Sequence, residues 1–177
     1  MDISLKNNKH CILVFGPEGS GTKFVTSVFC RLGWFGDYGW EQRLDSDIDF
    51  HNENRIVFRR SFPHGNKWCN IKDIEKRFAD YNTSIIVMFR DWHTSLLSQT
   101  TNGHVGSPTS SLQNLRRAYH YIFKSLSEFD NYVVISLGDI LGDFGDVILR
   151  KSLGIINVSI PTDFNFKINK KLSSKYF

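Results

Sequence analysis

The stretch GPEGSGTKF, residues 16–24, brings together the side chains best suited to bind an anion. Its glycines, which allow a tight turn, are Gly16, Gly19 and Gly21. The hydroxyl donors Ser20 and Thr22 and the cation Lys23 accompany them. Backbone amides in such a loop converge on a phosphate, and a following helix adds a favourable dipole. The stretch therefore predicts a phosphate-binding loop, and a glycine-rich turn without a ligand is the alternative.

The order of Thr22 and Lys23 bears on which phosphate is bound. In a nucleotide triphosphatase the last glycine is followed by Lys, which reaches the terminal phosphates, and then by a hydroxyl that holds magnesium. Here the spacing from Gly16 to Gly21 is kept but the two residues are transposed. Lys23 is thus turned by about 100° around the helix. This order disfavours a magnesium nucleotide.

The elements around the loop follow from hydrophobic periodicity. Continuous apolar runs, typical of strands covered on both faces of a parallel sheet, occupy residues 11–15, 55–58, 84–89 and 132–137. Helical patterns fall between them, at residues 24–32, 71–79, 111–129 and about 142–153. The last of these is expected to pack through Phe144, Val147, Ile148 and Leu153. Alternating strands and helices predict an α/β three-layer fold with a parallel sheet.

Two further features come from this pattern. Arg116, Arg117 and Lys124 fall off the apolar stripe of helix 111–129, toward solvent. The segments 33–54 and 101–110 show no periodicity, and irregular loops of that length are often functional.

Length and composition set limits on the class of protein. We expect 177 residues to form one domain, 1–177. No run approaches the roughly 20 apolar residues of a membrane span, so no membrane association is expected. The 3 cysteines lack paired spacing and indicate reduced thiols in a cytoplasmic protein, with neither disulfides nor a metal site. A net charge of +4 suits an anionic ligand, but the basic residues are scattered, so no nucleic-acid partner is expected.

With these features in view, the loop resembles the 5′-phosphosulfate-binding loop of sulfotransferases, in which Ser-Gly-Thr opens the first helix. The resemblance implies a P-loop NTPase-like fold and the metal-free cofactor 3′-phosphoadenosine-5′-phosphosulfate (PAPS), with 3′,5′-adenosine bisphosphate as product. Many members of the family carry Lys or Arg just before Ser-Gly-Thr, where this chain has Gly19. The missing charge is then expected from Lys23, Arg59 or Arg60.

A second part of the chain is similar to the same family. Arg90 follows the third apolar run, at the strand edge where open α/β sheets bind ligands, and Ser98 comes eight residues later. In sulfotransferases an Arg and a Ser so placed bind the 3′-phosphate of the cofactor. An ion pair of Arg90 with Asp91, and an ordinary helix position for Ser98, are the alternatives. Residues 132–155, with Asp139 in an acidic turn, extend the resemblance.

Sulfuryl transfer needs a base for the acceptor proton and positive charge at the leaving phosphate. The segment FRRSFPHGNKW, residues 58–68, offers Arg59 and Arg60 for the charge and His64 for the base. Lys23 is a further catalytic candidate. His64 as a solvated turn residue is the alternative. Glu18, His93 and His104 are less favoured as the base, with a capping or surface role as the alternative for His93. Lys170 and Lys171 could close over the 3′-phosphate of the cofactor, and a solvated basic tail is the alternative.

The sequence leads to a PAPS-dependent sulfotransferase acting on a hydroxyl or amine of a small molecule or glycan. One alternative is a P-loop small-molecule or nucleotide kinase that uses ATP and magnesium, with Asp91 as the metal-holding acid. Another is a non-catalytic nucleotide- or phosphate-binding module. The acceptor and the oligomeric state are not specified by the sequence.

Overall fold

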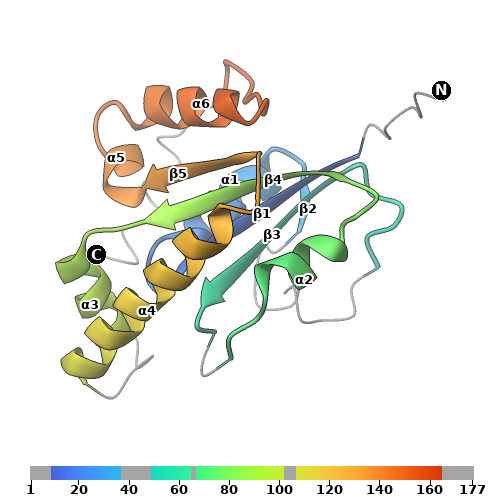
Figure 1. Ribbon diagram of the computed structural model, residues 1–177. Coiled ribbons are helices and arrows are strands. Elements are labelled where there is room, and N and C mark those ends of the chain that lie inside the picture. The colour runs from blue at the N-terminus through green and yellow to red at the C-terminus, as the bar shows by residue number, and fades with distance from the viewer. Residues whose placement is uncertain (1–8, 37–48, 65–66, 102–106, 165–177) are drawn as a thin grey trace.

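The computed structural model describes residues 9–36, 49–64, 67–101 and 107–164, and shows a parallel sheet between two layers of helices (Figure 1). The five strands are β1 (His10–Pro17), β2 (Phe35–Gly36), β3 (Arg55–Phe62), β4 (Asn82–Phe89) and β5 (Tyr132–Ser136). The helices are α1 (Thr22–Arg31), α2 (Ile71–Lys76), α3 (Trp92–Thr101), α4 (Pro108–Leu126), α5 (Leu137–Leu141) and α6 (Gly145–Ile155). The predicted α/β fold with a parallel sheet is confirmed.

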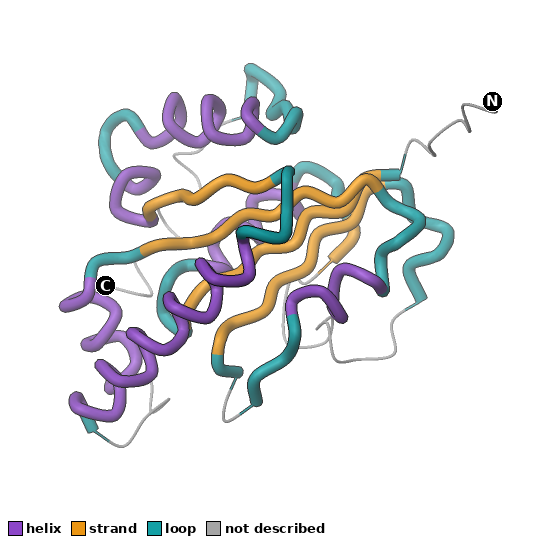
Figure 2. Tube along the Cα trace, in the orientation of Figure 1, coloured by secondary structure: helices purple, strands orange, loops and turns teal. Residues whose placement is uncertain are grey.

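The strand order is β2-β3-β1-β4-β5, so β1 lies in the middle with β3 and β4 as its two neighbours. All pairings are parallel, and the register sets Phe15 of β1 beside Arg60 of β3 and Val87 of β4. Carboxyl ends of parallel strands meet at one edge of a sheet. The segments that follow β1, β3 and β4 therefore come together there, as the tube view shows (Figure 2).

Alternating residues of β1 feed two separate cores. Leu13 and Phe15 pack with α2 and α4 on one face, together with Phe58 of β3. Ile12 and Val14 pack with α1 and α6 on the other face. Because each side of the sheet is covered, the central strands are buried along nearly their whole length, which explains their continuously apolar sequences.

The edges of the sheet differ from the prediction. β5 buries only alternate residues, and Tyr132 and Val134 are 40% and 41% exposed because β5 is an outermost strand. The predicted run 132–137 also ends early, since the Ser136 side chain caps α5 by accepting from the Asp139 amide. The two-residue β2 and the single-turn α5 were not predicted. Both are too short to produce a periodic signal.

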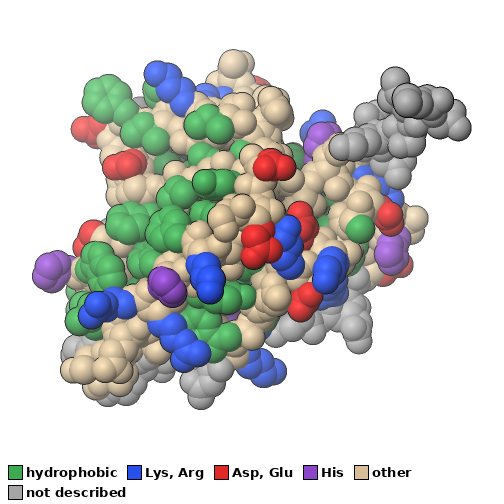
Figure 3. Space-filling view, in the orientation of Figure 1, with side chains coloured by type: hydrophobic (Ala, Val, Ile, Leu, Met, Phe, Trp, Pro, Cys, Tyr) green, Lys and Arg blue, Asp and Glu red, His purple; other side chains and the backbone are tan. Residues whose placement is uncertain are grey.

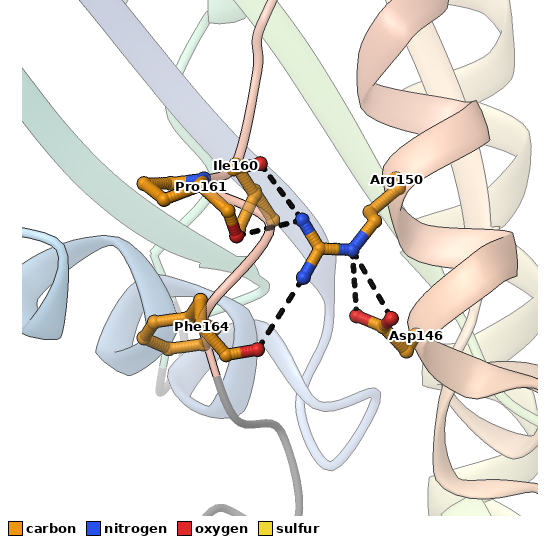
Figure 4. Close-up of polar contacts among 5 residues, drawn as sticks. All are labelled: Asp146, Arg150, Ile160, Pro161 and Phe164. Carbon is orange, nitrogen blue, oxygen red and sulfur yellow. Dashed lines mark hydrogen bonds and ion pairs between the residues drawn. The ribbon is translucent and has the colours of Figure 1, made fainter.

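The predicted packing of the last helix was wrong in part. Phe144 and Val147 are 74% and 48% exposed, whereas Leu153 and the partly buried Ile148 pack against the core as predicted, together with Leu149. α6 also holds the segment that follows it (Figure 4). The Arg150 guanidinium donates to the carbonyl oxygens of Ile160, Pro161 and Phe164 at 2.7, 2.8 and 3.3 Å, and its Nε pairs with Asp146 at 2.9 Å. Residues 156–164 are thereby fixed beside the core on the α1 side.

Candidate functional site

The glycine loop connects the end of β1 to the start of α1, as the sequence predicted. Its turn is closed by the Ser20 amide, which donates to the Pro17 carbonyl at 3.1 Å. Gly19 and Gly21 have φ angles of 82° and 95°, in the left-handed region that favours glycine. Gly21 is the N-cap of α1 and no side chain caps this end. The first amides of α1 therefore lack the side-chain acceptor that usually satisfies them.

The loop is also packed so tightly that side chains would not fit at its glycines. A Cβ at Gly16 would collide with Ser20 Oγ and lie 2.9 Å from the Met88 carbonyl. A Cβ at Gly21 would lie 2.8 Å from the Leu137 side chain. Ser20 is fully buried, and its hydroxyl has no hydrogen-bond partner among the described residues. A buried hydroxyl without a partner is costly, which is typical of a site completed by a ligand.

Arg90 links the loop to β4. Its Nη1 donates to the Gly19 carbonyl at 2.9 Å, and its backbone amide donates to the Tyr119 hydroxyl at 3.2 Å. The residue is only 6% exposed. Burial lowers the pKa of Arg90 from its ordinary value, while Asp91 and Tyr119 oppose that shift. A guanidinium stays charged even so, and Arg90 therefore sets a positive charge directly against Gly19.

α3 turns a polar face toward the loop. Ser95 and Gln99 are 0% and 3% exposed, and Gln99 Nε2 donates to the Glu18 carbonyl at 2.7 Å. A Cβ at Gly19 would lie 3.1 Å from Ser98 Oγ, so the hydroxyl that the sequence predicted for phosphate binding stands against the loop. Positions i, i+3 and i+4 share one side of a helix, which is why Ser95, Ser98 and Gln99 all face the loop.

On the other side of β1, β3 brings Arg59 and Arg60 to the base of the loop. They pair in register with Val14 and Phe15, which lie two residues and one residue before Gly16. Side chains alternate along a strand, so Arg60 shares the α2 and α4 face with Phe15, and Arg59 the α1 face with Val14. Arg60 is 5% exposed, and the Nε atoms of both residues are buried without a hydrogen bond. Arg59 and Arg60 thus place two cations beside the end of β1, one on each face of the sheet.

The remaining candidates are less closely tied to the loop. His64 is half-buried in the turn after β3, where its backbone exchanges two hydrogen bonds of 3.1 Å with Lys67. Lys23 is half-buried in the first turn of α1, next to the buried Thr22. His93 is exposed in the first turn of α3. His104, Lys170 and Lys171 lie outside the described residues. The catalytic roles of Lys23, Arg59, Arg60 and His64 stay predictions.

Three residues at the loop were not predicted as site residues. Gln99 was an unmarked helix position, Tyr119 was counted only as part of an apolar stripe, and Leu137 was assigned to a strand. Gln99 donates to Glu18, Tyr119 accepts from Arg90, and Leu137 packs against Gly21. Each of these contacts joins distant parts of the chain. Gln99 lies one helical turn after Ser95 and next to Ser98, and that polar spacing on a helix after Arg90 was the available clue.

Comparison with known proteins supports the fold. No protein-family model matches the sequence, and no curated protein matches it. Among solved structures, the chain is similar to the sulfotransferase domain from the curacin biosynthetic pathway, with a TM-score of 0.57 and 11% sequence identity. The likeness covers 87% of this chain and 76% of that one. At this level of identity it shows a common fold, which is the sulfotransferase-like arrangement that the sequence predicted.

None of the helices in the described part of the chain is long and apolar enough to cross a bilayer. No three His, Cys, Asp or Glu side chains in the same part of the chain gather as ligands for a metal ion.

Proposed function

We propose that this protein is a sulfotransferase that uses PAPS as the sulfuryl donor. The observation that carries the proposal is the contact of Arg90 with Gly19, at 2.9 Å, with Ser98 on the same side of the loop. The sequence assigned these residues to two ends of one cofactor, and β1 and β4 are neighbouring strands. The similarity to a sulfotransferase domain supports the same conclusion.

The residues present fit such a cofactor. The glycines form a cradle that a Cβ at Gly16 or Gly21 would fill, and the buried Ser20 hydroxyl lacks a partner there. Arg90 supplies a buried cation beside Gly19, the position where related loops carry Lys or Arg. Arg90 therefore adds a cation near the loop to the expected Lys23, Arg59 and Arg60.

In this proposal the loop amides, with Ser20 and Thr22, hold the 5′-phosphosulfate, and Arg90 and Ser98 hold the 3′-phosphate. PAPS, when bound, supplies the sulfuryl group that is transferred. Arg59 and Arg60, at the base of the loop, stabilise negative charge on the leaving phosphate oxygens. His64, in the turn after β3, accepts the proton of the acceptor hydroxyl or amine. Arg59, Arg60 and His64 all lie at or near the carboxyl end of β3.

The kinase alternative needs Asp91 as a magnesium ligand, and the structure gives this carboxylate another role. Its Oδ1 accepts from the Thr94 amide at 2.9 Å, and its Oδ2 accepts from the Thr94 hydroxyl. Asp91 directly precedes α3, so it acts as the N-cap of that helix. This capping role favours the sulfotransferase proposal over the kinase.

Calorimetric titration tests the proposal with three ligands: 3′,5′-adenosine bisphosphate, 5′-AMP and ATP, the last with and without magnesium. We expect metal-independent binding of the bisphosphate and a clear preference for it over 5′-AMP. Arg90→Ala should reduce that preference by about 30-fold, the loss expected when a charged contact worth roughly 2 kcal/mol is removed, and Arg90→Lys, which keeps the charge, should reduce it less. The ratio of affinities is informative even if a variant folds less well, because both ligands bind the same folded fraction.

Sulfate transfer from PAPS to hydroxyl and amine acceptors then separates an enzyme from a binding module. A preference for ATP with magnesium would contradict the proposal. Bisphosphate binding without transfer to any acceptor would favour the module.

A further inference from the structure

The outer face of α4 carries exposed basic side chains, and the helix itself contains no acid. No Asp or Glu occurs between Asp91 and Glu128, a stretch that includes all of α3 and α4. Arg116, His120 and Lys124 are all exposed on α4. They repeat every four residues, so they follow one side of the helix at a spacing of about 6 Å. Lys and Arg side chains and a histidine gather over this helix in the space-filling view (Figure 3).

These side chains are not neutralised by their surroundings. Among the described residues, none forms an ion pair with Arg116, His120 or Lys124. The acids of α2 pair within their own helix, Asp73 with Lys76 at 3.3 Å and Glu75 with Lys72 at 3.8 Å. The α4 face therefore presents a line of donors to a partner, of which Arg116 and Lys124 carry a positive charge.

Other residues of α4 contact the candidate site and the segment after β3. The Arg117 guanidinium lies 4.5 Å from the ring centre of Trp68, in the segment that follows β3. Tyr121 of α4 packs edge-on against Trp68 and donates to the Cys69 carbonyl at 2.6 Å. On its buried side, α4 places Tyr119, whose hydroxyl accepts from the Arg90 amide. The middle of α4 thus stands beside both strands that flank the loop.

We propose that this face of α4 binds an anionic glycan and guides it into the site as the sulfuryl acceptor. The inference rests on the proposed function in assigning the acceptor role, while the binding itself rests on the charge of the face alone. Regularly spaced donors along one line of a helix suit a linear chain with regularly spaced carboxylate or sulfate groups. Gln113 and Thr109, exposed toward the start of α4, extend the line with hydroxyl and amide groups that hydrogen-bond sugars.

Two other partners fit less well. A folded protein partner needs an apolar centre to its interface, and the large apolar side chains that the described part of α4 exposes are only Leu112 and Phe123, at 39% and 45%. A nucleic acid is bound through many phosphate contacts, whereas this acid-free stretch holds only Arg116, Arg117 and Lys124 as permanent cations. A moderate charge repeated along a line favours the glycan.

Fluorescence anisotropy tests the inference with a dye-labelled oligogalacturonate of about eight sugars. Neutral maltooctaose, a single-stranded DNA of similar length and phosphatidylglycerol vesicles serve as comparison ligands. We expect oligogalacturonate to bind best and to weaken as salt increases. Arg116→Ser/Lys124→Ser should weaken it roughly three- to tenfold, given the modest contribution of each exposed charge pair.

The matched control is Arg31→Ser/Lys151→Ser, which removes the same charge from exposed positions on α1 and α6. This control should change oligogalacturonate affinity less than twofold, and both double variants should bind 3′,5′-adenosine bisphosphate like the parent protein. Equal loss in the two double variants would overturn the inference, as would tighter binding to DNA, vesicles or maltooctaose. Failure to bind the bisphosphate would instead overturn the proposed function, because the bisphosphate is assigned to the loop, Arg90 and Ser98 and not to the exposed side chains of α4.

Discussion

Gly19→Ala is the substitution that best tests how the loop is built. Gly19 has a φ of 82°, and this left-handed conformation costs an L-residue about 1–2 kcal/mol. The new Cβ would also lie 3.1 Å from Ser98 Oγ and 3.3 Å from Ser98 Cβ, so α3 would have to move by a few tenths of an ångström. Crowding of this kind adds about 1 kcal/mol. We therefore expect the free energy of unfolding to fall by about 2–3 kcal/mol.

Gly33→Ala provides the control for Gly19→Ala. Gly33 has nearly the same φ, 81°, but no heavy atom lies within 4 Å of the position that its Cβ would take. It should lose only the conformational part, about 1–2 kcal/mol. Urea unfolding measures both variants, and the difference between them reports the contact of Gly19 with α3. Adding Ser98→Gly to Gly19→Ala should recover that difference.

The reasoning would be refuted if Gly19→Ala were no more destabilising than Gly33→Ala. In that case the loop would not be packed against α3. A Lys at position 19, as related loops carry, would then be tolerated as well. If the reasoning holds, Gly19→Lys should destabilise the protein at least as much as Gly19→Ala.

Two further predictions concern residues that hold elements in place. Hydrogen bonds to Thr94 lower the pKa of Asp91, so its capping of α3 is present above the ordinary pKa of 3.8 and is lost as the pH falls below it. Asp91→Ala should cost about 1 kcal/mol at pH 7 and much less near pH 2, which urea unfolding across pH will show, and an equal cost at both pH values would contradict this role. Arg150→Ala removes the donors to three carbonyls and should cost about 2 kcal/mol, with faster amide exchange in residues 156–164. Lys151→Ala, next to it and exposed, should stay within about 0.5 kcal/mol of the parent, and a similar effect of both would exclude the role of Arg150.

The central strands were predictable because burial on both faces leaves a continuous apolar run. This signal identified β1, β3, β4 and β5, but it does not distinguish a central strand from an outer one. The exposure of Tyr132 and Val134 on β5 was therefore missed. The exposure of Phe144 and Val147 was missed for a similar reason, since an apolar residue on a helix does not reveal which side of the helix is covered.

The candidate site was predictable where a motif has a fixed spacing. The glycine loop has one, and Arg90 was found from its place at the end of a strand. Gln99 and Tyr119 have none, because an amide or a phenol that holds a backbone group can come from any element that packs nearby. Their roles depend on the three-dimensional arrangement of α3 and α4 around the loop.

The dependence of the loop on α3 and β4 affects how far it can be treated as a portable motif. The carbonyls of Glu18 and Gly19 are held by Gln99 and Arg90, which lie 81 and 71 residues further along the chain. Grafting residues 16–23 into another strand–helix connection would transfer the amino-acid sequence of the motif but leave these two carbonyls without their donors. A working transplant would need the end of β4 and the first turns of α3 as well. The functional unit for engineering is thus a pair of adjacent strand–helix connections.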